Sequence, residues 1–104
     1  MEVENNTVVA ERNDVFRKSG TSFTVTNGVI ALGDVIGIVD KVRSFNDFTD
    51  NNDPHGEHDF GEFSWRGEEI FWKIDYYDKE LKYGKDPLDP ECNRVLTVLL
   101  ASEY

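Results

Sequence analysis

The feature that most constrains this chain is a pair of segments in which apolar and polar residues alternate on either side of a short turn. Residues 60–65 alternate aromatic residues with small ones, and residues 69–77 place a large apolar residue at every second position: Ile70, Trp72, Ile74 and Tyr76. A period of two indicates strands with one buried face, and Arg66-Gly67 can turn the chain between them. We therefore predict a β-hairpin.

Two other segments have the spacing of helices. Residues 6–18 end before Gly20 and have basic residues in the last turn, where they suit the negative end of a helix. The apolar residues of this segment are Val8, Val9, Val15 and Phe16. Residues 34–44 place an apolar residue every three or four positions, and Asp34 can cap their N-terminus. We predict helices at both places.

Two further strands are predicted. Residues 22–26 alternate apolar with hydroxyl residues, and Asn27-Gly28 can turn the chain into a hairpin partner at residues 29–32. After Arg94, residues 94–101 are apolar on both faces apart from one threonine, which suits a central strand. Residues 78–93 contain two prolines and a glycine and are predicted to form a long connection.

These elements predict one α+β domain over residues 1–104. The chain has 104 residues, which is the size of a single domain. We expect an antiparallel sheet of about four strands, with the two predicted helices packed on one face.

Charge restricts the classes of partner. The formal net charge is -10, which opposes direct binding to nucleic acid and to an anionic membrane surface and favours a basic protein surface. No apolar run is long enough to cross a bilayer, and the acidic N-terminus lacks the features of a signal peptide, so we expect a cytoplasmic protein. Cys92 is the single cysteine, which excludes an internal disulfide and a cysteine-rich zinc site.

The acidic residues are concentrated where the aromatic residues are. Residues 44–69 hold eight acidic residues and only Arg66 as a base, and nine of the 13 aromatic residues fall between Phe45 and Tyr77. A solvated acidic tail would lack such aromatic anchors, so we expect an ordered acidic surface. The residues predicted to bind a basic partner are Asp47, Asp50, Asp53, Glu57, Asp59 and Glu62.

Both histidines lie within the same acidic segment. Imidazole and carboxylate are ligands that zinc and manganese accept, so His55, His58 and Asp59 form a candidate site for a divalent metal such as zinc, with Glu57 or Asp75 as a general base. The order His-Gly-Glu-His departs from the helical zinc motif, and Pro54 and Gly56 disfavour a helix there.

Other interpretations of this segment stay open. Residues 51–62 partly match a calcium-binding loop, but histidine at its fifth position is a poor calcium ligand. Alternatively, Asn52 and Asp53 bond to their own backbone to build a turn, and the histidines tie the loop to neighbouring strands. Asp75 either meets one of the histidines or pairs with Lys73.

Four segments resemble an uncharacterised bacterial family, a domain of unknown function. They are residues 52–61 (NDPHGEHDFG), 73–78 (KIDYYD), 86–90 (DPLDP) and 94–104 (RVLTVLLASEY), and residues 12–17 and 26–29 are also similar to that family. The resemblance implies an identity without an activity. Because members are often small proteins of plasmids and prophages, it also suggests an analogy to anti-CRISPR inhibitors.

Two functional hypotheses follow. The first is an acidic protein-binding module that blocks a basic nucleic-acid-binding groove, as an anti-CRISPR protein or a DNA mimic does to a bacterial defence effector. The second is a metal-binding domain or a small metal-dependent hydrolase that uses the His55–His58 loop. We expect binding rather than catalysis, because a domain of this size has little room for a substrate pocket.

Overall fold

The computed structural model describes residues 5–20 and 23–104, with the side chains of residues 5 and 6 left out. Its elements are α1 (Asn5–Ser19), β1 (Thr24–Val25), α2 (Asn27–Ala31), α3 (Val35–Ser44), β2 (Phe60–Trp65), β3 (Glu68–Tyr77), β4 (Asn93–Leu100) and a short 3-10 helix, η1 (Ala101–Glu103). The helices predicted over residues 6–18 and 34–44 are confirmed, with small differences at their ends. The hairpin predicted over residues 60–65 and 69–77 is confirmed as well.

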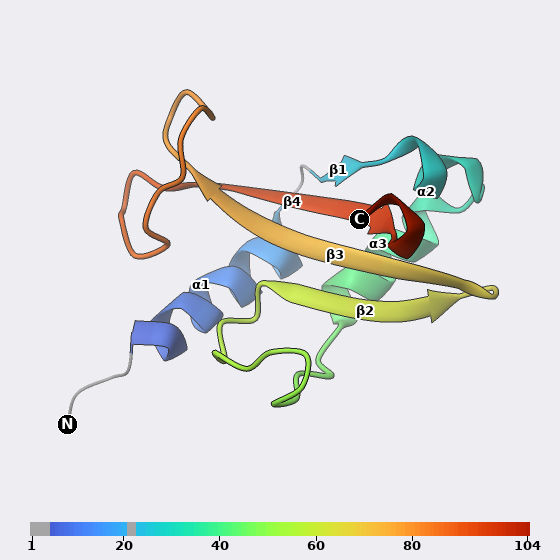
Figure 1. The fold of residues 1–104 in the computed structure, drawn as a ribbon, viewed down its shortest axis with the longest axis horizontal. Helices are drawn as coiled ribbons and strands as arrows, with labels where there is room; N and C mark the ends of the chain where they lie inside the picture. Colours follow the sequence, from blue (N-terminus) through green and yellow to red (C-terminus); the bar gives the residue numbers. More distant parts are fainter. Residues whose placement is uncertain (1–4, 21–22) are drawn as a thin grey trace.

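The four strands form one sheet in the order β1-β4-β3-β2 (Figure 1). β2, β3 and β4 are antiparallel, whereas β1 runs parallel to β4 and makes the sheet mixed. The α+β class is therefore confirmed, and β4 lies inside the sheet as its apolar pattern indicated. α1 and α3 lie on the same face of the sheet, and the opposite face carries no long helix among the described residues (Figure 1).

The predicted hairpin after Asn27-Gly28 is wrong. These residues begin α2, whose N-terminus is capped by the Thr26 hydroxyl, and Val29 is fully buried against the sheet. Gly28 lies close to η1 rather than in a turn, because a Cβ there would lie 2.7 Å from the Glu103 carboxylate unless that side chain moved. β1 pairs with β4 instead, with Thr24 opposite Thr97. Residue 22 of the predicted strand lies outside the described residues.

The turn between β2 and β3 has the geometry that its sequence indicated. Arg66 and Gly67 have φ angles of 49° and 86°, both in the left-handed region. A two-residue turn with this conformation matches the twist of the flanking strands.

Asp34 also caps α3 as predicted, because its carboxylate accepts a hydrogen bond of 3.0 Å from the Gly37 amide.

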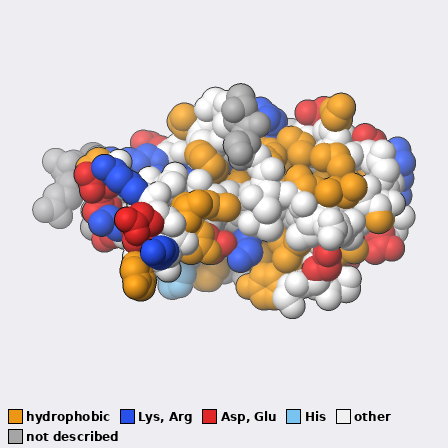
Figure 2. All heavy atoms as spheres, turned by 90° about the horizontal axis from the view of Figure 1, so that it is seen from above, with side chains coloured by type: hydrophobic (Ala, Val, Ile, Leu, Met, Phe, Trp, Pro, Cys, Tyr) orange, Lys and Arg blue, Asp and Glu red, His pale blue; other side chains and the backbone are white. Residues whose placement is uncertain are grey.

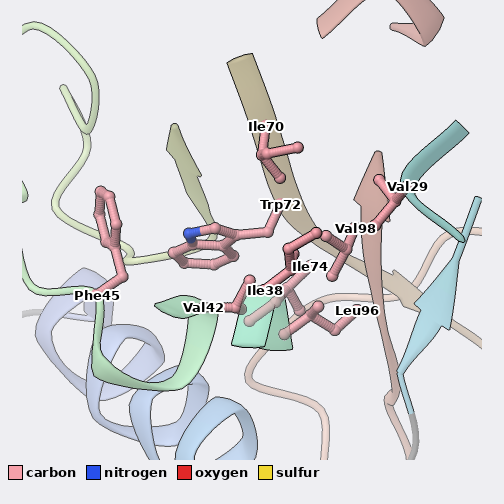
Figure 3. Close-up of a cluster of buried hydrophobic side chains, with 9 residues drawn as sticks. All are labelled: Val29, Ile38, Val42, Phe45, Ile70, Trp72, Ile74, Leu96 and Val98. Carbon is pink, nitrogen blue, oxygen red and sulfur yellow. The ribbon is translucent and has the colours of Figure 1, made fainter. Parts of the chain in front are cut away.

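The apolar core lies between α3 and the inward faces of β3 and β4. Its buried members are Val29, Ile38, Val42, Phe45, Ile70, Trp72, Ile74, Leu96 and Val98. In Figure 3 the Trp72 indole extends toward Phe45, away from the end of the cluster where Val29 and Val98 lie. Gly61 of β2 covers the indole so closely that a Cβ at this position would overlap the Trp72 ring. The core therefore demands glycine in the middle of β2.

Candidate functional site

The connection between α3 and β2, residues 45–59, carries most of the predicted site and is called the acidic loop here. Its first half is built by its own side chains: the Asn52 amide donates to the Asp47 carbonyl at 2.8 Å, and its oxygen accepts from the Thr49 amide at 2.9 Å. Asp53 is buried and accepts from the backbone amides of Glu57 and His58. The prediction that Asn52 and Asp53 build the turn is confirmed.

His58 ties the acidic loop to α1. Its Nδ1 lies 3.0 and 3.1 Å from the two carboxylate oxygens of Asp14, and its Nε2 lies 3.8 Å from Asp53. The ring also stacks on Phe48, with centroids 3.8 Å apart and an interplanar angle of 3°. With φ at 55°, His58 adopts a left-handed conformation that is uncommon outside glycine and needs such contacts to hold it. His58 thus tethers the loop, but the predicted partner is wrong, because the ring is held by a helix and not by a strand.

Asn13 of α1 is the centre of a second set of hydrogen bonds. It is fully buried, and its amide donates to the Glu57 carbonyl at 2.9 Å and to the Tyr76 hydroxyl at 2.8 Å. Its oxygen accepts from Arg94 Nε at 2.7 Å, and Tyr76 in turn donates to Asp59 at 3.2 Å. One side chain thus connects a helix, the loop and two strands.

Arg17, one helical turn after Asn13, is also buried. Its guanidinium donates to the carbonyls of Val42, Arg43 and Phe45, where α3 ends, at 2.7 to 3.1 Å. A further bond of 3.0 Å joins it to Asp14. These bonds satisfy carbonyl groups that a helix end leaves without partners, and the positive charge suits the negative end of α3.

Aromatic rings complete the surroundings of Arg17. The guanidinium lies 5.0 Å from the Trp72 ring and 5.5 Å from the Phe48 ring, both within the range of cation–π attraction. We call the group that joins α1 to the acidic loop and the sheet the polar clamp; its members are Asn13, Asp14, Arg17, Asp53, His58, Asp59, Tyr76 and Arg94.

Sequence patterns did not identify the polar clamp. The inward face of α1 includes Asn13 and Arg17 as well as Val9 and Ala10, whereas Val15, counted among its apolar residues, is 65% exposed. A signal was present in the spacing, because Asn13 and Arg17 follow Val9 at intervals of four residues. Polar residues on such a stripe are ordinarily assigned to solvent.

The carboxylates of the acidic loop lie close enough to repel one another. Partial burial raises the pKa of Glu57, and the charges of Asp59 and Asp53 raise it further. Burial also raises the pKa of Asp59, against the lowering effect of the Tyr76 hydrogen bond, and the charges of Asp53 and Asp75 add to the rise. Burial is likewise the largest cause of the raised pKa of Tyr76. The effects of Asp53, Asp59 and Asp75 show that these carboxylates lie near one another.

The six residues predicted to bind a partner fall into two groups. Asp47, Asp50 and Glu62 are exposed. Asp53 is buried in the turn, while Glu57 and Asp59 are partly buried. The structure therefore leaves three carboxylates fully available and gives Asp53 and Asp59 hydrogen bonds within the molecule.

Asp47 and Glu62 line one shallow groove beside β2, which we call the edge groove. Its volume is about 320 Å³, and it is lined by Lys41, Ser44, Phe45, Asn46, Asp47, Glu62 and Phe63. Its lining combines two phenylalanine residues with two acidic residues and one lysine. Figure 2 shows a different part of the surface, seen from above, where hydrophobic side chains occupy the middle and acidic and basic side chains are mixed toward the left end.

The predicted metal ligands do not converge in the described part of the chain. No group of three or more His, Cys, Asp or Glu side chains there is arranged to hold a metal ion. His58 is engaged by Asp14, Asp59 accepts from Tyr76, and His55 is exposed in the loop. Asp75 pairs with Lys73 at 2.9 Å, which was one of its two predicted partners. Metal binding stays a prediction.

Comparison with known proteins gives a family. No curated protein and no solved structure matches the chain. Separately, no helix among the described residues has the length and apolarity needed to cross a membrane. A family model described as a protein of unknown function, DUF3768, matches residues 25–103, from β1 to η1. This match includes the acidic loop but not α1, so residues 12–17, which also resembled the family, lie outside it. Because the match spans well over half of the sequence, the chain belongs to the DUF3768 family.

Proposed function

We propose that this protein is an acidic protein-binding module whose partner presents a basic surface, in the cytoplasm as the sequence led us to expect. The observation that carries the proposal is the position of Asp47, Asp50 and Glu62: they are exposed on or beside a loop that buried hydrogen bonds attach to the rest of the molecule. Charge of this kind steers a basic partner toward the surface.

Attachment of the loop supports binding. A loop that is free in solution loses conformational entropy when a partner orders it, and this loss weakens the complex. Here Asn13 and Asp14 hold the backbone and the His58 ring before any partner arrives. The cost of ordering is therefore largely met during folding.

The raised pKa values of Glu57 and Asp59 also support a cationic partner. Burial is the largest cause of both raised pKa values, and neighbouring negative charges add to the rise. Lysine or arginine side chains placed near these carboxylates would offset the repulsion and so act to lower both pKa values. A nucleic-acid-binding groove is one basic surface that fits, and the proposal includes competition with nucleic acid for it.

The test is a capture experiment from a bacterial lysate with two matched variants. One neutralises the exposed carboxylates by Asp47→Asn, Asp50→Asn and Glu62→Gln. The control makes the same change in net charge elsewhere on the exposed surface, by Glu11→Gln, Asp40→Asn and Glu80→Gln. Proteins retained by each bait are identified by mass spectrometry after washes of increasing salt.

We expect a protein that the native chain and the control variant retain, that the first variant loses, and that salt or DNA releases. Equal retention by all three baits would show that these carboxylates do not select the partner. A salt-resistant complex would contradict the electrostatic basis of the proposal.

A further inference from the structure

The sheet has two edges of unequal length. β1 contributes only Thr24–Val25 to one edge, whereas β2 contributes the six residues Phe60–Trp65 to the other. An edge strand presents backbone N–H and C=O groups that can pair with another extended chain. β2 is therefore the longer template.

The register identifies which groups of β2 point outward. The Ile74 amide donates to the Asp59 carbonyl at 2.8 Å, which makes residues 59 and 74 a hydrogen-bonded pair at the start of the ladder. Hydrogen-bonded and non-bonded pairs alternate along antiparallel strands. Gly61, Phe63 and Trp65 consequently bond to β3, while the backbone groups of Phe60, Glu62 and Ser64 face away from it.

Within the described part of the chain, these outward groups have no hydrogen-bond partner. The edge groove lies beside them, and its lining includes Phe45 and Phe63 as well as Asp47, Glu62 and one basic residue, Lys41. A backbone edge, apolar side chains and acidic residues thus lie together.

We propose that β2 receives an extended basic segment of the partner protein, which adds to the sheet as a fifth strand. This inference rests on the proposed function, and it specifies the binding mode. In strand addition the backbone bonds supply affinity, and pockets for alternate side chains supply specificity.

Charge decides which extended chain fits. A second copy of this protein would bring another net charge of -10, with its own Glu62 near the first. Like charges opposed across strands are unfavourable, whereas lysine or arginine opposite Glu62 is favourable. The same charge thus protects the edge from self-association and selects a basic strand.

The alternation of side chains gives the pattern of the segment. Glu62 and its β3 partner Phe71 are on the sheet face away from α3, and Phe63 is on the α3 side with the core. A residue of the added strand opposite Glu62 therefore points to the same face of the sheet as Glu62. The residues before and after it in the added strand point to the other face, toward the edge groove. The segment would alternate basic residues with apolar ones.

The first test uses the native chain and a synthetic octapeptide of alternating lysine and valine. Amide hydrogen exchange measured by NMR should be fast for Phe60, Glu62 and Ser64 and slow for Gly61, Phe63 and Trp65 in the free protein. Adding the peptide should slow the first three amides. A peptide of alternating glutamate and valine should leave them unchanged.

The second test blocks the edge without changing the charge. Ser64→Pro removes an outward N–H, and proline is tolerated on the open side of an edge strand. Ser64→Ala is the matched control, because both variants lose the hydroxyl that donates to Glu69. We expect Ser64→Pro to bind the lysine–valine peptide about tenfold more weakly than Ser64→Ala does, since one hydrogen bond is lost and a ring intrudes.

The outcomes separate this inference from the proposed function. Protection of the three outward amides, with weaker binding by Ser64→Pro, supports strand addition. If the lysate partner is captured in the charge-dependent way expected above but these amides stay unprotected, the edge is not the docking site and only the proposed function stands. Absence of peptide binding at millimolar concentration, or dimers paired through β2, would also overturn strand addition.

Discussion

Two regions attach the helices to the sheet, and they do so by different physics. Under α3, the contacts are apolar and come from buried side chains such as Ile38, Val42 and Trp72. Under α1, hydrogen bonds and ion pairs are added to the apolar contacts of residues such as Val9, and the buried polar residues Asn13 and Arg17 are at their centre. Trp72 belongs to both, because its ring packs in the core and also faces the Arg17 guanidinium.

The difference shows which region tolerates substitution and which region fixes one arrangement of the chain. Apolar packing is non-directional and tolerates substitutions of similar volume. A buried polar group loses its solvation and must find partners at defined distances and angles. The core can thus hold a range of related sequences, whereas the polar clamp fixes one arrangement of the acidic loop.

The largest effect should come from Arg17→Met. The substitution keeps an apolar stem but removes the ion pair with Asp14, which retains His58 as a partner, and the guanidinium that donates to three carbonyls at the end of α3. We expect the free energy of unfolding, measured with urea, to fall by about 4 kcal/mol. The exposed neighbour offers a control: Lys18→Met should change it by less than about 0.5 kcal/mol. A loss below about 1 kcal/mol for Arg17→Met would show that the clamp adds little stability.

A somewhat smaller effect is expected in the apolar region. Ile38→Ala empties space in the core and should lower the free energy of unfolding by about 3 kcal/mol, whereas Ile36→Ala, at a position 78% exposed, should have little effect. In the folded protein, Ile38→Ala should leave the amide exchange of the acidic loop unchanged, because no contact of the polar clamp is removed. Faster exchange at residues 53–58 would instead show that the two regions are one cooperative unit.

The smallest effect concerns pH, and it has opposite signs at two places. The raised pKa of Asp59 means that the folded state binds this proton more tightly, so acidification through that pKa, above 3.8, favours folding. Glu103 has a lowered pKa, chiefly because the Thr26 hydroxyl donates to it, so its contribution is present above 4.5 and is lost as the pH falls.

Carboxyl NMR titration of the native chain should give Asp59 a pKa above its ordinary value and Glu103 a pKa below its ordinary value. Stability curves check the sign: as the pH falls from neutral, the native chain should gain stability relative to Asp59→Asn and lose it relative to Glu103→Gln. Parallel curves for both variants would contradict the assignment.

Much of the fold could be predicted because the spacing of the apolar residues and the residue types at the turns agree with the side chains that the structure buries. The alternation in β3, the Arg66-Gly67 turn and the Asp34 cap are local signals, and all are confirmed. The Asn27-Gly28 turn failed for a tertiary reason, because Thr26 can cap a helix and Val29 then reaches the core. Local sequence allowed both conformations, and packing chose between them.

The candidate site could be predicted only in part. The acidic loop and the turn-building roles of Asn52 and Asp53 follow from composition and residue type. The partners of Asn13 lie 44 to 81 positions away along the chain, so no short pattern reveals them. Asp53 differs, because the turn that its own carboxylate builds also buries it, so the prediction that it lies on an exposed binding surface is wrong for a local reason.

The stacking of Phe48 on His58 makes the loop observable. A proton held over an aromatic ring experiences the local magnetic field of the circulating electrons, so the imidazole resonances should be shifted upfield while the two rings stay parallel. Loosening of residues 45–59 would move those resonances back toward random-coil positions. The imidazole chemical shifts of His58 therefore report whether a mutation or a bound peptide has disturbed the loop.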